Sequence, residues 1–129
     1  MKQILTLISL FTLLASATCK ERRTYPQNCY KGQLAVKGQC MNYTIKLLEG
    51  AMDTAYYQRR WTNEFTGITY ENVFRLSSLC SFPNSIAEGQ TFYFIIPPAP
   101  PVEKCNVCMA YYPTPNKSVF IKVVDAPCK

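Results

Sequence analysis

The feature that most restricts how this chain can fold is its set of seven cysteines within 129 residues. A high cysteine content is typical of small secreted domains, in which disulfides supplement a hydrophobic core of limited size. Because seven is an odd number, one cysteine is left without a partner inside a monomer. We therefore expect a disulfide framework, with one surplus thiol or intermolecular bridge, among Cys19, Cys29, Cys40, Cys80, Cys105, Cys108 and Cys128.

The N-terminal residues predict secretion, and therefore a compartment in which disulfides persist. Lys2 precedes an apolar run from Ile4 to Leu14, and Ala15 to Ala17 match the small-x-small pattern of a signal-peptide cleavage site. The apolar run is shorter than the roughly 20 residues that a membrane-spanning helix needs. We interpret residues 1–17 as a signal peptide and residues 18–129 as a single secreted, extracellular domain.

Two N-glycosylation sequons fit the same compartment. The triplets Asn-Tyr-Thr and Asn-Lys-Ser begin at Asn42 and Asn116. Each places a hydroxyl side chain two residues after an asparagine, which is the pattern that N-glycosylation requires. We therefore expect a glycoprotein in which Asn42 and Asn116 are the acceptors.

The residue types argue against an enzyme. The chain has no histidine, which removes Ser-His and Cys-His catalytic pairs and every histidine-ligated metal site. Its carboxylates are scattered, and it has no glycine-rich phosphate loop. The CNVC sequence from Cys105 to Cys108 could be half of a zinc site, but no second CxxC completes it. We expect no catalytic residues, no cofactor and no intrinsic metal.

The expected mature domain is basic. Thirteen basic and eight acidic residues follow the signal peptide, so the net charge is thirteen minus eight, or +5. One interpretation is a solvated surface that keeps a secreted protein soluble, and the other is attraction to anionic matrix polysaccharide or to an acidic protein face. We expect no nucleic-acid partner and no stable membrane insertion. The basic groups are Lys20, Arg22 and Arg23, then Arg59 and Arg60, then Lys117 and Lys122.

Short alternating or β-branched and aromatic stretches predict strands at 34–37, 43–48, 71–80 and 91–97. Residues 118–124 fit a strand or a short helix, and residues 52–70 fit a long hairpin or a mobile loop. Pro97 to Pro101 must be extended, and a stiff connector suits them better than a ligand for an aromatic groove. Many short strands favour an all-β sandwich or barrel. The candidate core residues are Leu34, Val36, Ile45, Leu47, Leu76, Phe92, Phe94, Ile96 and Phe120.

Several segments follow one another in an order that suggests a family. NCYKGQLAVKG places a cysteine before a first strand, and MNYTIKLLEG carries an aromatic-x-Ile-Lys sequence that runs to a glycine. SSLCSFPNSIAEGQTFYFI adds a cysteine, a loop and a strand, and CMAYYPTPNKSV precedes a final APC. This order resembles the netrin-like domain, which tissue inhibitors of metalloproteinases share with netrins and complement components. The resemblance covers essentially the whole mature chain.

The resemblance implies a mainly β fold: a small five-stranded Greek-key barrel of the OB type, linked by disulfides, with a flanking helix. Carried over position by position, it pairs Cys19 with Cys80 and Cys29 with Cys128. The inhibitors begin Cys-x-Cys, whereas this chain has Glu21 at the third position. The third implied pair therefore joins Cys40 to Cys105 or Cys108, and the other of these two becomes the surplus thiol.

The resemblance also implies a function, inhibition of extracellular metalloproteinases. In the inhibitors the mature chain begins with cysteine, whose α-amino group and carbonyl oxygen bind the protease zinc. A neutral amino group can donate its lone pair to zinc, so no side-chain chemistry is needed. The implied inhibitory wedge consists of Cys19, Lys20 and Cys80, and Cys19 would contact the partner's zinc only as the first residue.

The cleavage pattern opposes that role, because cleavage after Ala17 leaves Thr18 ahead of Cys19. The charge of Lys20 would also be costly in an apolar specificity pocket. The alternative is a non-inhibitory extracellular binding module for matrix polysaccharide or a protein partner. The sequence leaves the partner, the oligomeric state and the mature N-terminal residue open.

Overall fold

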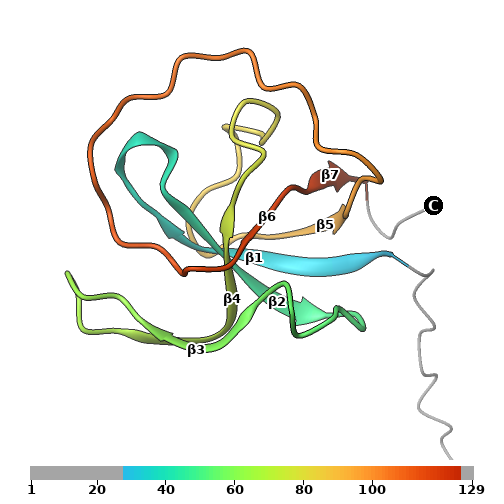
Figure 1. The fold of residues 1–129 in the computed structure, drawn as a ribbon. Helices are drawn as coiled ribbons and strands as arrows, with labels where there is room; N and C mark the ends of the chain where they lie inside the picture. Colours follow the sequence, from blue (N-terminus) through green and yellow to red (C-terminus); the bar gives the residue numbers. More distant parts are fainter. Residues whose placement is uncertain (1–27, 126–129) are drawn as a thin grey trace, which may run out of the picture.

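The computed structural model describes residues 28–125, which form a mainly antiparallel β structure (Figure 1). This confirms the mainly β prediction. The predicted flanking helix is wrong for this part of the chain, where the only helical element is a three-residue 3₁₀ turn. No helix in the described part is long and apolar enough to cross a membrane. The elements are β1 (Tyr30–Lys37), η1 (Gln39–Met41), β2 (Tyr43–Glu49), β3 (Gln58–Thr62), β4 (Thr69–Leu76), β5 (Thr91–Ile95), β6 (Ser118–Val119) and β7 (Lys122–Val124).

The strands follow the order β3-β4-β2-β1-β5-β7, and β6 pairs with β4 in parallel off this path. β7 pairs with β5 in the antiparallel sense. Phe120 and Ile121 separate β6 from β7, so the final stretch is two short strands, and the sheet is not closed. The sequence allowed either a strand or a short helix at 118–124, and the structure has strands there.

Alternation of side chains explains why the central strands form. Every second residue of β1 is buried from Tyr30 to Val36, and β5 buries Phe92 and Phe94 in the same way. Leu34 lies opposite Ile45 on β2, and Tyr30 lies opposite Phe94 on β5. Cross-strand pairs of large apolar side chains such as these stabilise a sheet.

Residues 52–70, which the sequence left undecided, contain one strand of a hairpin. β3 pairs with β4 along Gln58–Thr62. The Trp61 and Tyr70 rings stack across the pair at 5.9 Å between centroids, and the hydroxyls of Thr62 and Thr69 are 2.8 Å apart. These cross-strand contacts hold the two strands in register.

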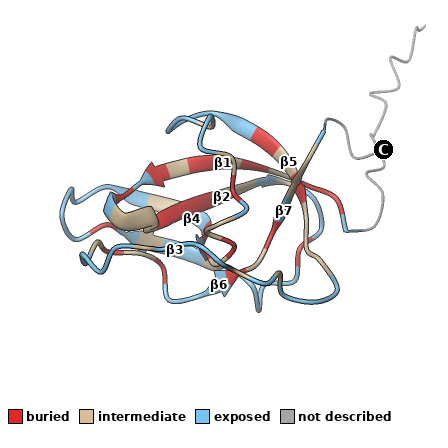
Figure 2. Cartoon of the chain, turned by 90° about the horizontal axis from the view of Figure 1, so that it is seen from above, coloured by how far each residue is buried: buried red, intermediate tan, exposed pale blue. Residues whose placement is uncertain are grey.

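The core lies where the buried faces of these strands meet (Figure 2). Of the predicted core residues, Leu47 and Ile96 are only partly buried and pack against the core. Phe120 is wrong, because its neighbours Val119 and Ile121 are the buried residues at 3% and 2% exposure. Side chains alternate along an extended chain, so burying these two directs Phe120 outward. The others are buried as predicted: Leu34, Val36, Ile45, Leu76, Phe92 and Phe94.

A long connection follows β5 and crosses one side of the molecule to β6 (Figure 1). We call residues 96–117 the arch. The arch contains no helix or strand and begins with the proline-rich stretch Pro97 to Pro101, which bends at residues 98 and 99 and is not extended throughout as predicted. Proline lacks a backbone donor and cannot continue the sheet, which explains why β5 ends here.

Candidate functional site

Two disulfides fasten the arch to the rest of the fold, and we call them the clasps. Cys108 bonds to Cys40 in η1, with the Cα atoms 5.0 Å apart. Cys105 bonds to Cys80 in the loop between β4 and β5, with a Cα separation of 5.5 Å. The Cys40–Cys108 bond is one of the two alternatives that the family resemblance implied for Cys40.

The Cys80–Cys105 clasp overturns the implied Cys19–Cys80 pair. The local contacts explain this pairing, because the Cys80 N–H donates to the Glu103 carboxylate and the Cys105 N–H points at the Cys80 sulfur, 3.1 Å away. The prediction that Cys105 or Cys108 is the surplus thiol is also wrong. All five cysteines within residues 28–125 are disulfide-bonded, so the surplus thiol lies outside them.

Cys29 is 3% exposed and disulfide-bonded, and its partner is not among the other described cysteines. The implied Cys29–Cys128 pair therefore involves a residue outside the described part. Cys19 and Lys20, the first two members of the implied inhibitory wedge, lie outside it as well. Of that wedge the structure describes only Cys80, in its bond to Cys105.

Glu103 and the Cys80–Cys105 clasp form a cluster whose potential ligand atoms lie within 4.8 Å of one another. Both sulfur atoms are committed to the disulfide, and a metal-ligating cysteine must be a free thiolate. The Glu103 carboxylate accepts a backbone N–H. The cluster therefore fastens the arch and offers no set of metal ligands.

A pocket of about 300 Å³ opens beside the clasps. Met41 and Leu79, the sequence neighbours of Cys40 and Cys80, line the pocket. Phe120, which was wrongly predicted to be a core residue, lines it as well. Arg75 supplies its cationic side chain, for which no acidic partner lies among residues 28–125. The lining residues are Met41, Asn42, Arg75, Leu76, Ser77, Leu79 and Phe120.

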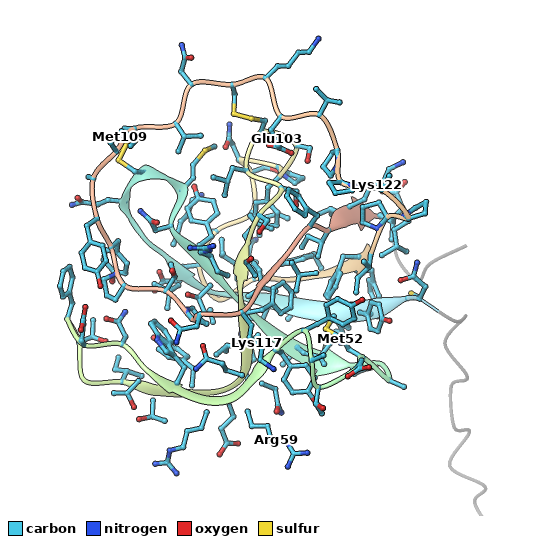
Figure 3. The ribbon with its side chains drawn as sticks, viewed as in Figure 1. Met52, Arg59, Glu103, Met109, Lys117 and Lys122 are labelled. Atoms are coloured by element: carbon cyan, nitrogen blue, oxygen red, sulfur yellow. A yellow bond between two sulfur atoms is a disulfide. The ribbon has the colours of Figure 1, made fainter. Side chains whose placement is uncertain are left out.

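Large apolar side chains are exposed where the β3–β4 turn meets the arch, and we call this group the aromatic corner. Phe65 and Ile68 come from the turn, at 60% and 52% exposure, and Tyr111 from the arch at 70%. Met109, two residues before Tyr111, is 97% exposed (Figure 3). Such a concentration of exposed apolar side chains marks a contact surface more often than scattered single residues do.

Buried Asn63 holds the turn half of the corner in shape. Its side-chain oxygen accepts the Phe65 N–H at 2.9 Å, and its backbone N–H donates to the Ile68 carbonyl at 2.9 Å. Its own carbonyl accepts the Gly67 N–H at 2.7 Å, and the positive φ of +70° at Gly67 suits a residue without Cβ. Asn63 thus replaces solvent as the partner of three backbone groups.

The arch half of the corner is fixed by contacts to the turn. The Tyr111 hydroxyl donates to the Glu64 carboxylate at 2.6 Å, and this hydrogen bond raises the pKa of Tyr111. Phe65 meets the Tyr111 and Tyr112 rings edge-on, with centroid distances of 6.0 and 5.4 Å. Edge-to-face packing of this kind stabilises aromatic pairs.

Two features next to the Cys40–Cys108 clasp position the residues around Tyr111. The Asn42 side-chain amide donates to the carbonyls of Gln39 and Ala110, at 2.8 and 3.0 Å. Gly38 lies so close to Tyr112 that a Cβ at position 38 would be 2.6 Å from the ring. The chain thus fixes the corner before any partner binds.

Sequence reasoning did not find the aromatic corner. Phe65 and Tyr111 are far apart in the chain, and no periodicity links them. The available signals were the polar and aromatic composition of 52–70 and the aromatic-rich stretch after Cys108. Neither signal indicates that these two segments contact each other, because that contact depends on the path of the arch.

The basic groups do not form one cluster within the described part. Lys117 donates to the Thr54 carbonyl at 2.9 Å, and Figure 3 places Lys122 away from Arg59 and Lys117. Lys31 pairs with Glu49 at 3.3 Å. Residues 28–125 hold nine basic and seven acidic residues, a net charge of nine minus seven, or +2.

The two sequons differ in accessibility. The Asn42 amide is occupied by its two hydrogen bonds, and Thr44 of the same triplet is fully buried. Asn116 is exposed at the end of the arch, and only its backbone N–H is engaged, by Gln58 at 2.6 Å. The folded structure therefore accommodates a glycan at Asn116 and not at Asn42.

Comparison with known proteins gives no relative from which a function could be transferred. No protein-family model, curated protein or solved structure matches this chain.

Proposed function

We propose that this chain is a secreted, non-inhibitory binding module that contacts an extracellular protein through its aromatic corner. The observation that carries the proposal is the exposure of Phe65, Ile68 and Tyr111 where the β3–β4 turn meets the arch. Burial of apolar surface by a partner would be favourable in proportion to the area covered.

The way in which the corner is built also supports this role. Asn63 and the Glu64–Tyr111 hydrogen bond fix the side chains before binding. A preorganised surface loses less conformational entropy on association, so more of the contact energy contributes to affinity. Aromatic side chains are over-represented among the residues that dominate protein interfaces.

A protein partner fits the described residues better than a polysaccharide does. Anionic polysaccharide would be held by a concentrated basic surface. Lys122 lies away from Arg59 and Lys117, and the net charge of residues 28–125 is only +2. Retention on a polysaccharide would therefore depend on Lys20, Arg22 and Arg23, which lie outside the described part.

For the architecture, we propose the five-stranded OB-type barrel of the netrin-like resemblance. β4 pairs with β6 while β5 pairs with β7, so the final stretch of chain reaches both ends of the β4-β2-β1-β5 path. This arrangement supports the proposal, although Phe120 and Ile121 interrupt the final strand.

Metalloproteinase inhibition through Cys19 stays a prediction. In the implied mechanism, Cys19 and Cys80 are joined beside the protease zinc. Cys80 is instead bonded to Cys105, so the implied wedge lacks that covalent link. The binding-module proposal needs no such link, and it is therefore the function that the geometry supports better.

The test is to capture the partner at the corner and then to measure affinity. A photo-crosslinking residue at Met109 in the secreted protein would identify the extracellular partner by mass spectrometry. Dissociation constants with that purified partner are then compared for the native protein and for Phe65→Ala, Tyr111→Ala and Leu48→Ala. Leu48 is a matched control, because it is an apolar β2 residue at 40% exposure outside the corner.

We expect Phe65→Ala and Tyr111→Ala each to weaken binding by about tenfold or more, as for central interface aromatics. Leu48→Ala should change affinity by less than about twofold. Equal effects of all three variants, or unchanged affinity in the corner variants, would contradict the proposal. A parallel titration against a panel of extracellular metalloproteinases would favour the inhibitor hypothesis if tight inhibition survived both corner substitutions.

A further inference from the structure

We propose that thiol–disulfide exchange between the two clasps regulates the arch half of the aromatic corner: both clasps hold it in place, and their exchange into a Cys105–Cys108 bond releases it. The inference concerns regulation of the proposed binding surface, and in that respect it rests on the proposed function. It starts from the CNVC segment, whose two cysteines are bonded to different parts of the fold.

The geometry makes exchange between the clasps accessible. Cys105 and Cys108 are both exposed, with only two residues between them, whereas Cys29 is 3% exposed. A CxxC pair can close into its own disulfide, and its thiolates are often reactive. Breaking the Cys40–Cys108 clasp therefore generates a Cys108 thiolate three positions along the exposed arch from Cys105 of the other clasp.

The exchange balances with a monothiol such as glutathione as the reductant. A glutathione thiolate attacks the Cys40 sulfur, breaks the Cys40–Cys108 bond and leaves a mixed disulfide on Cys40. The Cys108 thiolate attacks the Cys105 sulfur, forms a Cys105–Cys108 bond and expels the Cys80 thiolate, which takes a proton. A second glutathione releases Cys40 as a thiol, so two glutathiones become oxidised glutathione while two disulfides become one.

Closure of the CxxC pair removes both covalent anchors of the arch. Met109 follows Cys108 directly, and Tyr111 lies two residues beyond it. Their remaining ties include the Asn42–Ala110 and Glu64–Tyr111 hydrogen bonds, both at exposed positions. The Phe65 contacts to the Tyr111 and Tyr112 rings also stay, so the arch half keeps only non-covalent ties. Each exposed hydrogen bond contributes little net stability, so the geometry of the arch half becomes less restricted and the partner binds more weakly.

The first experiment tests the exchange without any partner. The secreted protein is equilibrated in glutathione redox buffers, quenched with acid, alkylated and mapped by mass spectrometry. We expect an intermediate with a Cys105–Cys108 bond, alkylated Cys40 and Cys80, and an intact Cys29 disulfide. Direct conversion to four alkylated thiols without a Cys105–Cys108 species, or earlier reduction of the Cys29 bond, would overturn the proposal.

A variant with Cys80→Ser and Cys105→Ser is the matched control, because it keeps the Cys40–Cys108 clasp but lacks the resolving partner. Its clasp should be reduced about tenfold more slowly at millimolar glutathione, since the intramolecular step has a higher effective concentration. An unchanged rate would show that the CxxC segment does not participate.

The binding arm separates this inference from the proposed function. The isolated species with a Cys105–Cys108 bond should bind the partner identified by photo-crosslinking at least about fivefold more weakly than the native protein does. Its far-UV circular dichroism should be unchanged. Exchange without any loss of affinity, or loss of affinity only together with the sheet signal, would refute the regulatory role. If Phe65→Ala and Tyr111→Ala leave binding intact while the exchange occurs, the proposed binding surface is wrong and the exchange chemistry stands.

Discussion

Substitution of Gly38 by alanine tests how the fold positions the corner. Gly38 has a φ of −68°, which every residue tolerates, so backbone strain does not contribute. A Cβ there would lie 2.5 Å from the Asn42 carbonyl oxygen and 2.6 Å from Tyr112 Cδ1. Ordinary contacts begin at about 3.4 Å, so these neighbours must move by almost an ångström.

The expected cost follows from two opposing terms. Overpacking at such a site costs about 1–3 kcal/mol, and alanine in place of glycine stabilises by about 0.4–1 kcal/mol through the unfolded chain. The variant should therefore lose about 1–2 kcal/mol in its free energy of unfolding, measured by urea denaturation followed through Trp61 fluorescence. A neutral or stabilising result would refute the packing of Tyr112 against Gly38.

A double-mutant cycle with Tyr112→Ala identifies the cause. If the Tyr112 ring is the main obstacle, Gly38→Ala should cost at least about 0.5 kcal/mol less in the Tyr112→Ala background. An equal cost in both backgrounds would assign the effect to the Asn42 carbonyl alone.

Three further outcomes are expected. Peptide mapping of the protein, expressed through the secretory pathway, should find one glycan, which Asn116→Gln removes and Asn42→Gln does not; a glycan on Asn42 would contradict the structure. Since its pKa is raised, Tyr111 contributes stability below pH 10 that is lost as pH rises through the raised pKa. The 295 nm absorbance titration, which sums all nine tyrosines of the chain, should have one group that ionises at lower pH in Glu64→Ala than in the native protein, and identical curves would exclude the hydrogen bond. Phe94→Ala should cost about 3–5 kcal/mol in chemical denaturation, because Phe94 is fully buried, and a loss below 1 kcal/mol would contradict the core.

Much of the sheet could be predicted because its signal is local. Alternation marked Leu34, Ile45 and Phe94, whose burial follows directly from the two-residue period of a strand. At Phe120 the prediction was wrong by one residue, because Val119 and Ile121 on either side are the buried ones. Its two apolar neighbours were equally plausible core residues, and only the pairing of β6 and β7 decided between them.

The site could not be predicted in the same way, because its contacts depend on the path of the arch. Cys80 reaches Cys105 across the β4–β5 loop, and carrying over a family pairing assigned it a different partner. The Phe65–Tyr111 contact likewise joins a hairpin turn to a distant loop without any shared sequence period.

The central claim, that the aromatic corner binds an extracellular protein, is tested most directly by hydrogen–deuterium exchange. The full chain, expressed through the secretory pathway, is measured with and without the partner that photo-crosslinking identifies. We predict that binding protects amides at residues 63–69 and 108–112 and leaves those of β2 and β5 unchanged. Protection confined to the N-terminal segment around Cys19 and Lys20, with none at the corner, would contradict the claim and favour the inhibitor hypothesis.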